Sequence, residues 1–187
     1  EFDCIDGTAA SINSLNTTVK DCYIKGYVSV NANNVTFVNC EVYNSSIGIY
    51  QSSQIASFSC ISTKVNGKQV YVGYNVSDLI IKTMNYGEII LALASNITIS
   101  YMSMTTIIIV DSDDIHINNV DLRYGKYGIY MKNSQEIYLS QLAIEQQQDD
   151  IHLEQSSSIQ LSDSFLGEAD NGLYMCCLLY TSDAADD

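Results

Sequence analysis

Residues 21–53 decide the fold, and they read DCYIKGYVSVNANNVTFVNCEVYNSSIGIYQSS. Within this stretch, short runs such as Val28-Ser-Val30 and Asn34-Val-Thr-Phe37 alternate between apolar and polar residues, and polar turns separate the runs. Alternation with a period of two places the apolar side chains on one face of a β-strand, whereas a helix needs a period of 3.6. The stretch therefore predicts several short strands, each with one buried face.

The same unit recurs along the chain about every twenty residues. Its starts lie at positions 16, 34, 54, 78, 96, 114, 136 and 158, with steps of 18 to 24 residues, and a second short strand follows the first. One unit cannot bury its apolar face alone, but a stack of units can. We therefore predict an all-β fold, a right-handed parallel β-helix of about eight coils that forms one continuous rod and is truncated at both ends.

Two other architectures fit this pattern less well. A leucine-rich-repeat solenoid has a similar period but needs a fixed ladder of Leu and Asn, which is missing here. A β-sandwich has turn signals without a fixed register, whereas this chain keeps a register. The chain also contains no proline, as expected if every strand donates hydrogen bonds to a neighbouring coil.

Charge and hydropathy exclude several classes of partner. The chain carries 22 Asp and Glu against 8 Lys and Arg, for a net charge of −14. Because nucleic acids reward the opposite charge, we expect no nucleic-acid partner. The longest apolar runs, 89–94 and 107–110, are far shorter than the roughly 18 residues of a membrane-spanning helix, so we expect no membrane insertion. No signal peptide is visible in this fragment.

The end of the chain departs from the repeat. Residues 177–187 read CLLYTSDAADD, which resembles the translation of a transposon-based sequencing adapter. The adapter would also supply part of the codon for Cys176. We therefore predict that residues 1–175 are a β-helix fragment, and that residues 176–187 are an adapter-derived artefact and no domain.

The repeat also carries a family resemblance. The string at residues 21–53 is similar to coils of the carbohydrate-binding and sugar-hydrolase class of β-helix proteins, which includes the NosD-like periplasmic and surface proteins. The resemblance covers residues 1–175 and implies an extracellular, cell-surface or periplasmic protein whose partner is a polysaccharide or surface glycan. Such repeats occur in lyases, hydrolases, epimerases, adhesins and accessory proteins, so the resemblance leaves the activity open.

Aromatic residues recur at the middle of the second strand in each coil. Aligning the coils predicts a solvent-facing column in which Ile108 also lies. Its predicted carbohydrate-binding members are Tyr50, Tyr71, Tyr130, His152 and Tyr174. Rings along a rod offer apolar faces and polar tips on which sugar rings can stack. Tyrosine is also common at exposed strand positions, and a purely structural column is the alternative.

An acidic turn lies beside this column. Asp149, Asp150 and Asp170 fall on neighbouring coils, where paired carboxylates could act as general acid and base on a glycosidic bond or hold Ca²⁺. A solvated acidic turn is the simpler interpretation. We therefore assign no catalytic residue and no cofactor, and keep these acids as the alternative catalytic set.

The cysteines follow the coil period. Cys4, Cys22, Cys40 and Cys60 lie 18, 18 and 20 residues apart, which predicts one inward-facing column. Free thiols packed as small apolar groups and disulfides between coils both remain open. No pair has zinc-site spacing, and we predict no metal site. Asparagines at the repeat starts are expected to bond their equivalents in neighbouring coils.

The sequence thus supports one leading hypothesis and two alternatives. The leading hypothesis is a secreted or cell-surface β-helix that has a structural or carbohydrate-binding role, without catalysis. The first alternative is a polysaccharide-active hydrolase or lyase that uses the acidic turn. The second, implied by the resemblance alone, is a periplasmic accessory protein for metal-site assembly.

Overall fold

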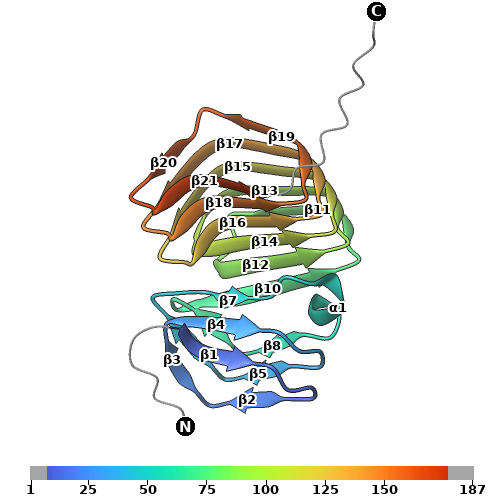
Figure 1. The fold of residues 1–187 in the computed structure, drawn as a ribbon, viewed down its shortest axis with the longest axis vertical. Coiled ribbons are helices and arrows are strands. Elements are labelled where there is room, and N and C mark those ends of the chain that lie inside the picture. The colour runs from blue at the N-terminus through green and yellow to red at the C-terminus, as the bar shows by residue number, and fades with distance from the viewer. Residues whose placement is uncertain (1–7, 177–187) are drawn as a thin grey trace, which may run out of the picture.

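The fold is a parallel β-solenoid of about eight turns (Figure 1). A computed structural model describes residues 8–176, and every strand pair in it is parallel except one. The predicted right-handed parallel β-helix is therefore confirmed. Its coils form two groups, which we call the N-terminal stack (residues 8–65) and the C-terminal stack (residues 68–176).

The N-terminal stack has three coils, and each coil contributes one strand to each of three sheets. The strands are β1 (Thr8–Ile12), β4 (Tyr27–Val30) and β7 (Ile47–Gly48); β2 (Thr18–Lys20), β5 (Thr36–Val38) and β8 (Ser59–Ile61); and β3 (Tyr23–Lys25), β6 (Glu41–Tyr43) and β9 (Lys64–Val65). A short helix, α1 (Ser52–Ile55), lies in the third coil.

The C-terminal stack is built on two long sheets. The first contains β10 (Lys68–Tyr74), β12 (Tyr86–Ala92), β14 (Thr106–Val110), β16 (Tyr127–Lys132), β18 (Asp149–Glu154) and β21 (Asn171–Cys176), and beyond β10 it continues into β9, β6 and β3 of the N-terminal stack. The second contains β11 (Ser77–Lys82), β13 (Ser95–Met104), β15 (Asp113–Arg123), β17 (Gln135–Glu145), β19 (Ser157–Ser162) and β20 (Phe165–Gly167). Strand β21 ends at Cys176, one residue beyond the predicted domain boundary, and residues 177–187 lie outside the described residues.

The corners of the coils fall where the repeat predicts them. Seven of the eight predicted starts adopt the left-handed conformation, with φ between 52° and 57°; the other, Gln54, lies in α1. Asparagine and aspartate tolerate this conformation better than other non-glycine residues. As predicted, the corner side chains bond between coils: Asn34 Nδ2 donates to Asn16 Oδ1 at 2.9 Å, and Asn96 Nδ2 donates to Asp78 Oδ1 at 2.7 Å.

A second device is a ladder of serines beside another corner. Ser134 Oγ donates to the carbonyl of Lys132 at 2.9 Å and accepts from the amide of Ser112 at 3.2 Å. Ser156 Oγ in turn accepts from the amide of Ser134 at 3.2 Å. The ladder pairs buried amides that the strands leave unpaired, and it thereby removes a desolvation cost.

The cysteine column is shorter than predicted. Cys22 and Cys40 are buried free thiols at equivalent positions of adjacent coils, because the residues that follow them, Tyr23 and Glu41, are in register. Cys60 instead pairs with Phe37, so its predicted place in the column is wrong. Thr63 stands there, and its hydroxyl accepts from the amide of Cys40 at 3.4 Å. Cys4 lies outside the described residues.

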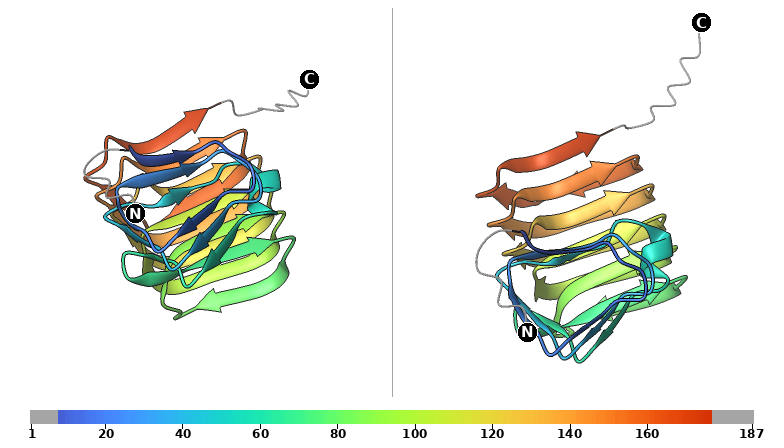
Figure 2. Two further views of the ribbon diagram at one scale, coloured as in Figure 1. Left: turned by 90° about the horizontal axis from the view of Figure 1, so that it is seen from below. Right: turned by 60° about the horizontal axis from the view of Figure 1, so that its bottom comes forward.

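The predicted single rod is also wrong, because the chain reverses at Asn66-Gly67. Strands β9 and β10 pair antiparallel, with Lys68 opposite Val65. Asn66 and Gly67 have φ of 50° and 78°, and positive φ at both central residues is what a two-residue hairpin turn requires. In Figure 2 the N-terminal coils are seen as open loops lying across the strands of the C-terminal stack.

This reversal buries both faces of the first sheet of the C-terminal stack at β12 and β14, which we call the central sheet. All side chains of 89–92 and 107–110 are at most 1% exposed. Ile89 and Ile107 belong to the core of the C-terminal stack, whereas Ile90 and Ile108 pack in one cluster with Ile47 and other core residues of the N-terminal stack. Continuous apolar runs, in place of alternation, are typical of strands covered on both faces.

Candidate functional site

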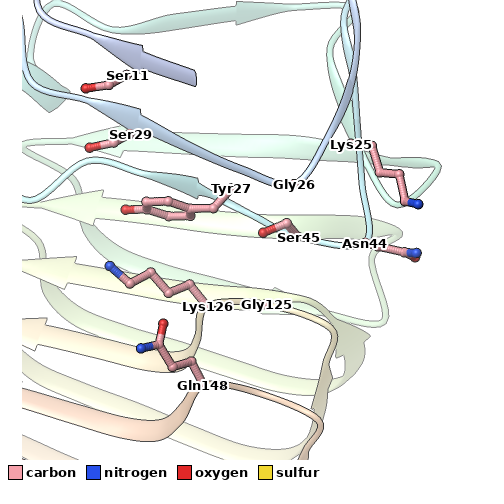
Figure 3. A pocket seen from close by; sticks show the side chains of 10 residues that line it. All are labelled: Ser11, Lys25, Gly26, Tyr27, Ser29, Asn44, Ser45, Gly125, Lys126 and Gln148. Carbon is pink, nitrogen blue, oxygen red and sulfur yellow. The ribbon is translucent and has the colours of Figure 1, made fainter. Parts of the chain in front are cut away.

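A cleft lies where the two stacks meet. Its volume is about 820 Å³, within the range of roughly 300–1,000 Å³ that is typical of ligand sites. The lining residues are Ser11, Lys25, Gly26, Tyr27, Ser29, Asn44, Ser45, Gly125, Lys126 and Gln148. Figure 3 shows Tyr27, Lys126 and Gln148 one below another, with their side chains pointing the same way.

Both stacks contribute to the walls of the cleft. Ser11 and Ser29 are partners on β1 and β4, and Tyr27 opens β4. Lys126 precedes β16 and Gln148 precedes β18, so both lie at turns of adjacent coils in the C-terminal stack. The backbone amide of Gln148 donates to the carbonyl of Lys126 at 3.1 Å, which fixes the spacing of these two turns.

Aromatic rings hold the ammonium group of Lys126. Its Nζ lies 4.7 Å from the ring centroid of Tyr27 and 4.9 Å from that of Tyr127. The Tyr27 hydroxyl forms a 2.5 Å hydrogen bond with the Tyr50 hydroxyl. Burial raises the pKa of Tyr27, so this phenol stays protonated at neutral pH. The cleft thus combines an aromatic ring and an ammonium group with hydroxyl and amide groups.

The predicted aromatic column is formed in part. Strand register aligns Ile108, Tyr130, His152 and Tyr174, as predicted. Tyr71 is one residue out of register, because it pairs with Ile89, and it lies instead in a groove beside Tyr86 with 5.3 Å between ring centroids.

Tyr50 approaches the column from the other stack. Its ring centroid lies 4.3 Å from that of Tyr130, so the two rings meet across the junction.

The exposure of this column differs from the prediction. Tyr130 is 2% exposed and His152 is 8% exposed, so neither faces solvent; Tyr174, on the last strand, is 41% exposed. The His152 ring stacks on Tyr130 at 5.2 Å and on Tyr174 at 4.5 Å, with interplanar angles of 18° and 19°. Because the rings cover each other's faces, a sugar ring has no room to stack between them.

The acidic turn holds its three residues in different environments. Asp149 Oδ2 bonds His152 Nδ1 at 2.9 Å, and Asp149 Oδ1 accepts from Asn171 Nδ2 at 2.8 Å. Asp150 is fully buried, and neither of its carboxylate oxygens has a hydrogen-bond partner. Burial raises the pKa of Asp150 to about 6. Asp170 is exposed.

This geometry limits what the acidic turn can do. Asp150 has no exposed surface with which to contact a polysaccharide, and Asp149 is occupied by two protein partners. Within residues 8–176, no three His, Cys, Asp or Glu side chains are arranged to hold a metal ion. Asp149, Asp150 and Asp170 therefore do not form the carboxylate cluster that the Ca²⁺ alternative needs. The three acids therefore form no joint site in the structure.

A further buried acid lies at the junction of the stacks. Glu88 on β12 is fully buried, and its Oε2 accepts from the backbone amide of Ile47 on β7 at 3.0 Å. Its Oε1 has no hydrogen-bond partner. Burial raises the pKa of Glu88 well above its ordinary value, because the buried carboxylate loses its hydration.

Comparison with known proteins identifies no relative: no protein-family model, no curated protein sequence and no solved structure matches the chain. The resemblance to NosD-like proteins therefore rests on the repeat alone, whereas the β-solenoid fold rests on the structure. The longest helix in residues 8–176 has four residues, too few to cross a membrane.

The repeat does not predict the cleft, because the cleft forms only through the reversal at Asn66-Gly67. Tyr27 and Lys126 lie 99 positions apart in the chain and meet only when the N-terminal stack folds onto the C-terminal stack. Two signals were present: the Asn66-Gly67 pair, typical of a hairpin, and the apolar runs at 89–94 and 107–110. Together they predict a reversal and a two-sided sheet.

Proposed function

We propose that this β-solenoid binds carbohydrate in the cleft between its two stacks. The observation that carries the proposal is the lining of the cleft. Hydroxyl groups of Ser11, Ser29 and Ser45 and the amide of Gln148 line the same cleft as the ring of Tyr27. Sugars present hydroxyl groups that both donate and accept, together with apolar ring faces, and this lining complements both features.

The cleft supports the proposal better than the aromatic column does. The rings of Tyr130 and His152 are stacked and buried, so they serve to pack the junction. Tyr50 reaches the cleft indirectly, through the hydrogen bond between its hydroxyl and that of Tyr27. Of the predicted carbohydrate-binding residues, Tyr174 and Tyr71 retain exposed ring surface, and they stay predicted contacts.

The proposed setting follows from the ligand. A polysaccharide or surface glycan would be met outside the cytoplasm, so we place the protein outside the cell, on its surface or in a periplasm. The proposed role is binding without catalysis, because the acids of the predicted catalytic turn are buried or already paired, apart from the exposed Asp170.

A glycan array tests this proposal. The full chain is expected to bind a subset of glycans, and Tyr27→Ala is expected to weaken binding by about 5- to 30-fold, because the ring contact is worth on the order of 1–2 kcal/mol. Tyr101→Ala is the matched control, since Tyr101 is exposed on a part of the surface that does not line the cleft. Absence of binding to every glycan, or equal loss in both variants, would overturn the proposal.

A further inference from the structure

We infer that the saccharide bound in the cleft is anionic, and that its carboxylate or sulfate group lies against the ammonium group of Lys126. The inference rests on the proposed function and adds the charge class of the ligand. Its starting point is the charge of the cleft. Among the described residues that line it, none is Asp or Glu, although the chain carries 22 acids and only 8 Lys and Arg.

Two other basic residues of the C-terminal stack, Lys132 and Arg123, are paired with carboxylates. Lys132 Nζ lies 3.1 Å from Glu154, and Arg123 contacts Asp121 at 3.0 Å and Glu145 at 3.2 Å. Lys126 differs from these two, because no carboxylate of residues 8–176 forms a salt bridge with it. The positive charge of Lys126 therefore stays available to a ligand.

The structure also holds the Lys126 ammonium group in place. Its Nζ lies over the rings of Tyr27 and Tyr127, and ring faces attract a cation without cancelling its charge. The backbone of the same residue is tied to both stacks: its amide donates to Ser46 Oγ at 3.4 Å, and its carbonyl accepts from the amides of Gln148 and Asp149 at 3.1 Å. A charge that is fixed before binding loses little freedom when the ligand arrives.

The geometry favours one acidic group among neutral hydroxyl partners. Lysine acts as a point charge and does not offer the bidentate fork of arginine, so it suits a single carboxylate or sulfate oxygen. The same cleft presents the amide of Gln148 and the hydroxyls of Ser29 and Ser45, which suit the remaining hydroxyl groups of a sugar.

A matched series of trisaccharides tests the inference by calorimetry on the full chain. Cellotriose, its triuronate oxidised at C6, and its 6-O-sulfate share one skeleton and differ in charge. We expect the triuronate or the sulfate to bind at least about tenfold more tightly than cellotriose at low salt, with the ratio shrinking in 0.5 M NaCl. The tighter of the two charged ligands identifies the acidic group, and either outcome supports the inference.

Variants locate the charge effect. Lys126→Gln is expected to reduce the charged-to-neutral affinity ratio to within about threefold, and Lys126→Arg is expected to keep most of it. Lys132→Gln is the matched control, because Lys132 is paired with Glu154 outside the cleft, and its ratio should match that of the unchanged chain. Circular dichroism confirms that each variant is folded.

The outcomes separate this inference from the proposed function. Binding of cellotriose and of the charged trisaccharides with equal affinity would overturn the anionic preference alone. A preference that survives Lys126→Gln would overturn the role of Lys126. Failure of all three trisaccharides, together with a blank glycan array, would overturn the proposed function and this inference with it.

Discussion

Glu88 of the C-terminal stack accepts a hydrogen bond from the backbone amide of Ile47 in the N-terminal stack at 3.0 Å, and both residues are fully buried. The contact provides a partner for an amide of β7, the strand at the edge of its sheet. It also places a carboxyl group in the apolar cluster that joins the stacks. The junction, and the cleft beside it, therefore depend on the protonation of one side chain.

The free energy of unfolding should fall with rising pH because of Glu88. Burial raises its folded-state pKa well above the ordinary 4.5, so the folded protein keeps a proton that the unfolded chain releases. Protonated Glu88 makes its full contribution to the free energy of unfolding below about pH 4.5. Above this pH the contribution declines, by at most about 1.4 kcal/mol per pH unit, until the folded-state pKa is reached.

Urea unfolding from pH 5 to pH 8 checks this expectation. Glu88→Gln keeps an acceptor for the Ile47 amide and has no proton to lose, so its stability should fall less steeply than that of the unchanged chain. Glu168→Gln, at an exposed position, should leave the slope unchanged. Identical slopes for the Glu88 variant and the unchanged chain would show that Glu88 is ionised in the folded protein.

Ionisation of Asp150 should also lower the free energy of unfolding as the pH rises. Burial raises its pKa from 3.8 to about 6, so stability from this group is lost as the pH rises from about 4 to 6. Asp150→Asn removes the charge and is expected to raise the free energy of unfolding at pH 7 by about 1–3 kcal/mol relative to that at pH 4. Thermal unfolding at these two pH values measures the change, and a variant without any pH-dependent gain would contradict the assignment.

Shortening a buried side chain should lower the free energy of unfolding by a similar amount on either face of the central sheet. Ile107→Ala and Ile108→Ala are each expected to destabilise the protein by about 2–4 kcal/mol, because one side chain fills the core of the C-terminal stack and the other fills the junction. Ile80→Ala is the control, since Ile80 is 63% exposed and should change stability by no more than about 0.5 kcal/mol. If Ile108→Ala behaves like Ile80→Ala, the N-terminal stack does not cover this face.

The repeat predicts the coils from local rules. Alternation gives the strands, and Asn or Asp at positions such as Asn34 and Asp78 gives the left-handed corners, since both depend on residues close in sequence. The relative placement of the stacks depends on contacts between distant residues, such as Ile47 with Glu88. A period of about twenty residues carries no information on these contacts, so the burial of Tyr130 and His152 could not be predicted from it.

The serine ladder should be sensitive to loss of one hydroxyl. Ser134→Ala leaves the buried amide of Ser112 without its acceptor, and we expect a loss of about 1–3 kcal/mol in the free energy of unfolding. Ser134→Cys should lose less, because Cys22 and Cys40 bond a backbone carbonyl two residues earlier in the same way. Urea unfolding of both variants checks the order, with Ser103→Ala as an exposed control. Equal stability of all three variants would contradict the ladder's role.

A crystal structure of the full chain with the cellotriuronate probe tests the proposed binding of an anionic saccharide in the junction cleft. We expect sugar density between the stacks, with one carboxylate within about 3 Å of Lys126 Nζ and a sugar ring beside Tyr27. Density along Tyr174 with an empty cleft would contradict the proposed site, as would a bound sugar whose carboxylates all point away from Lys126.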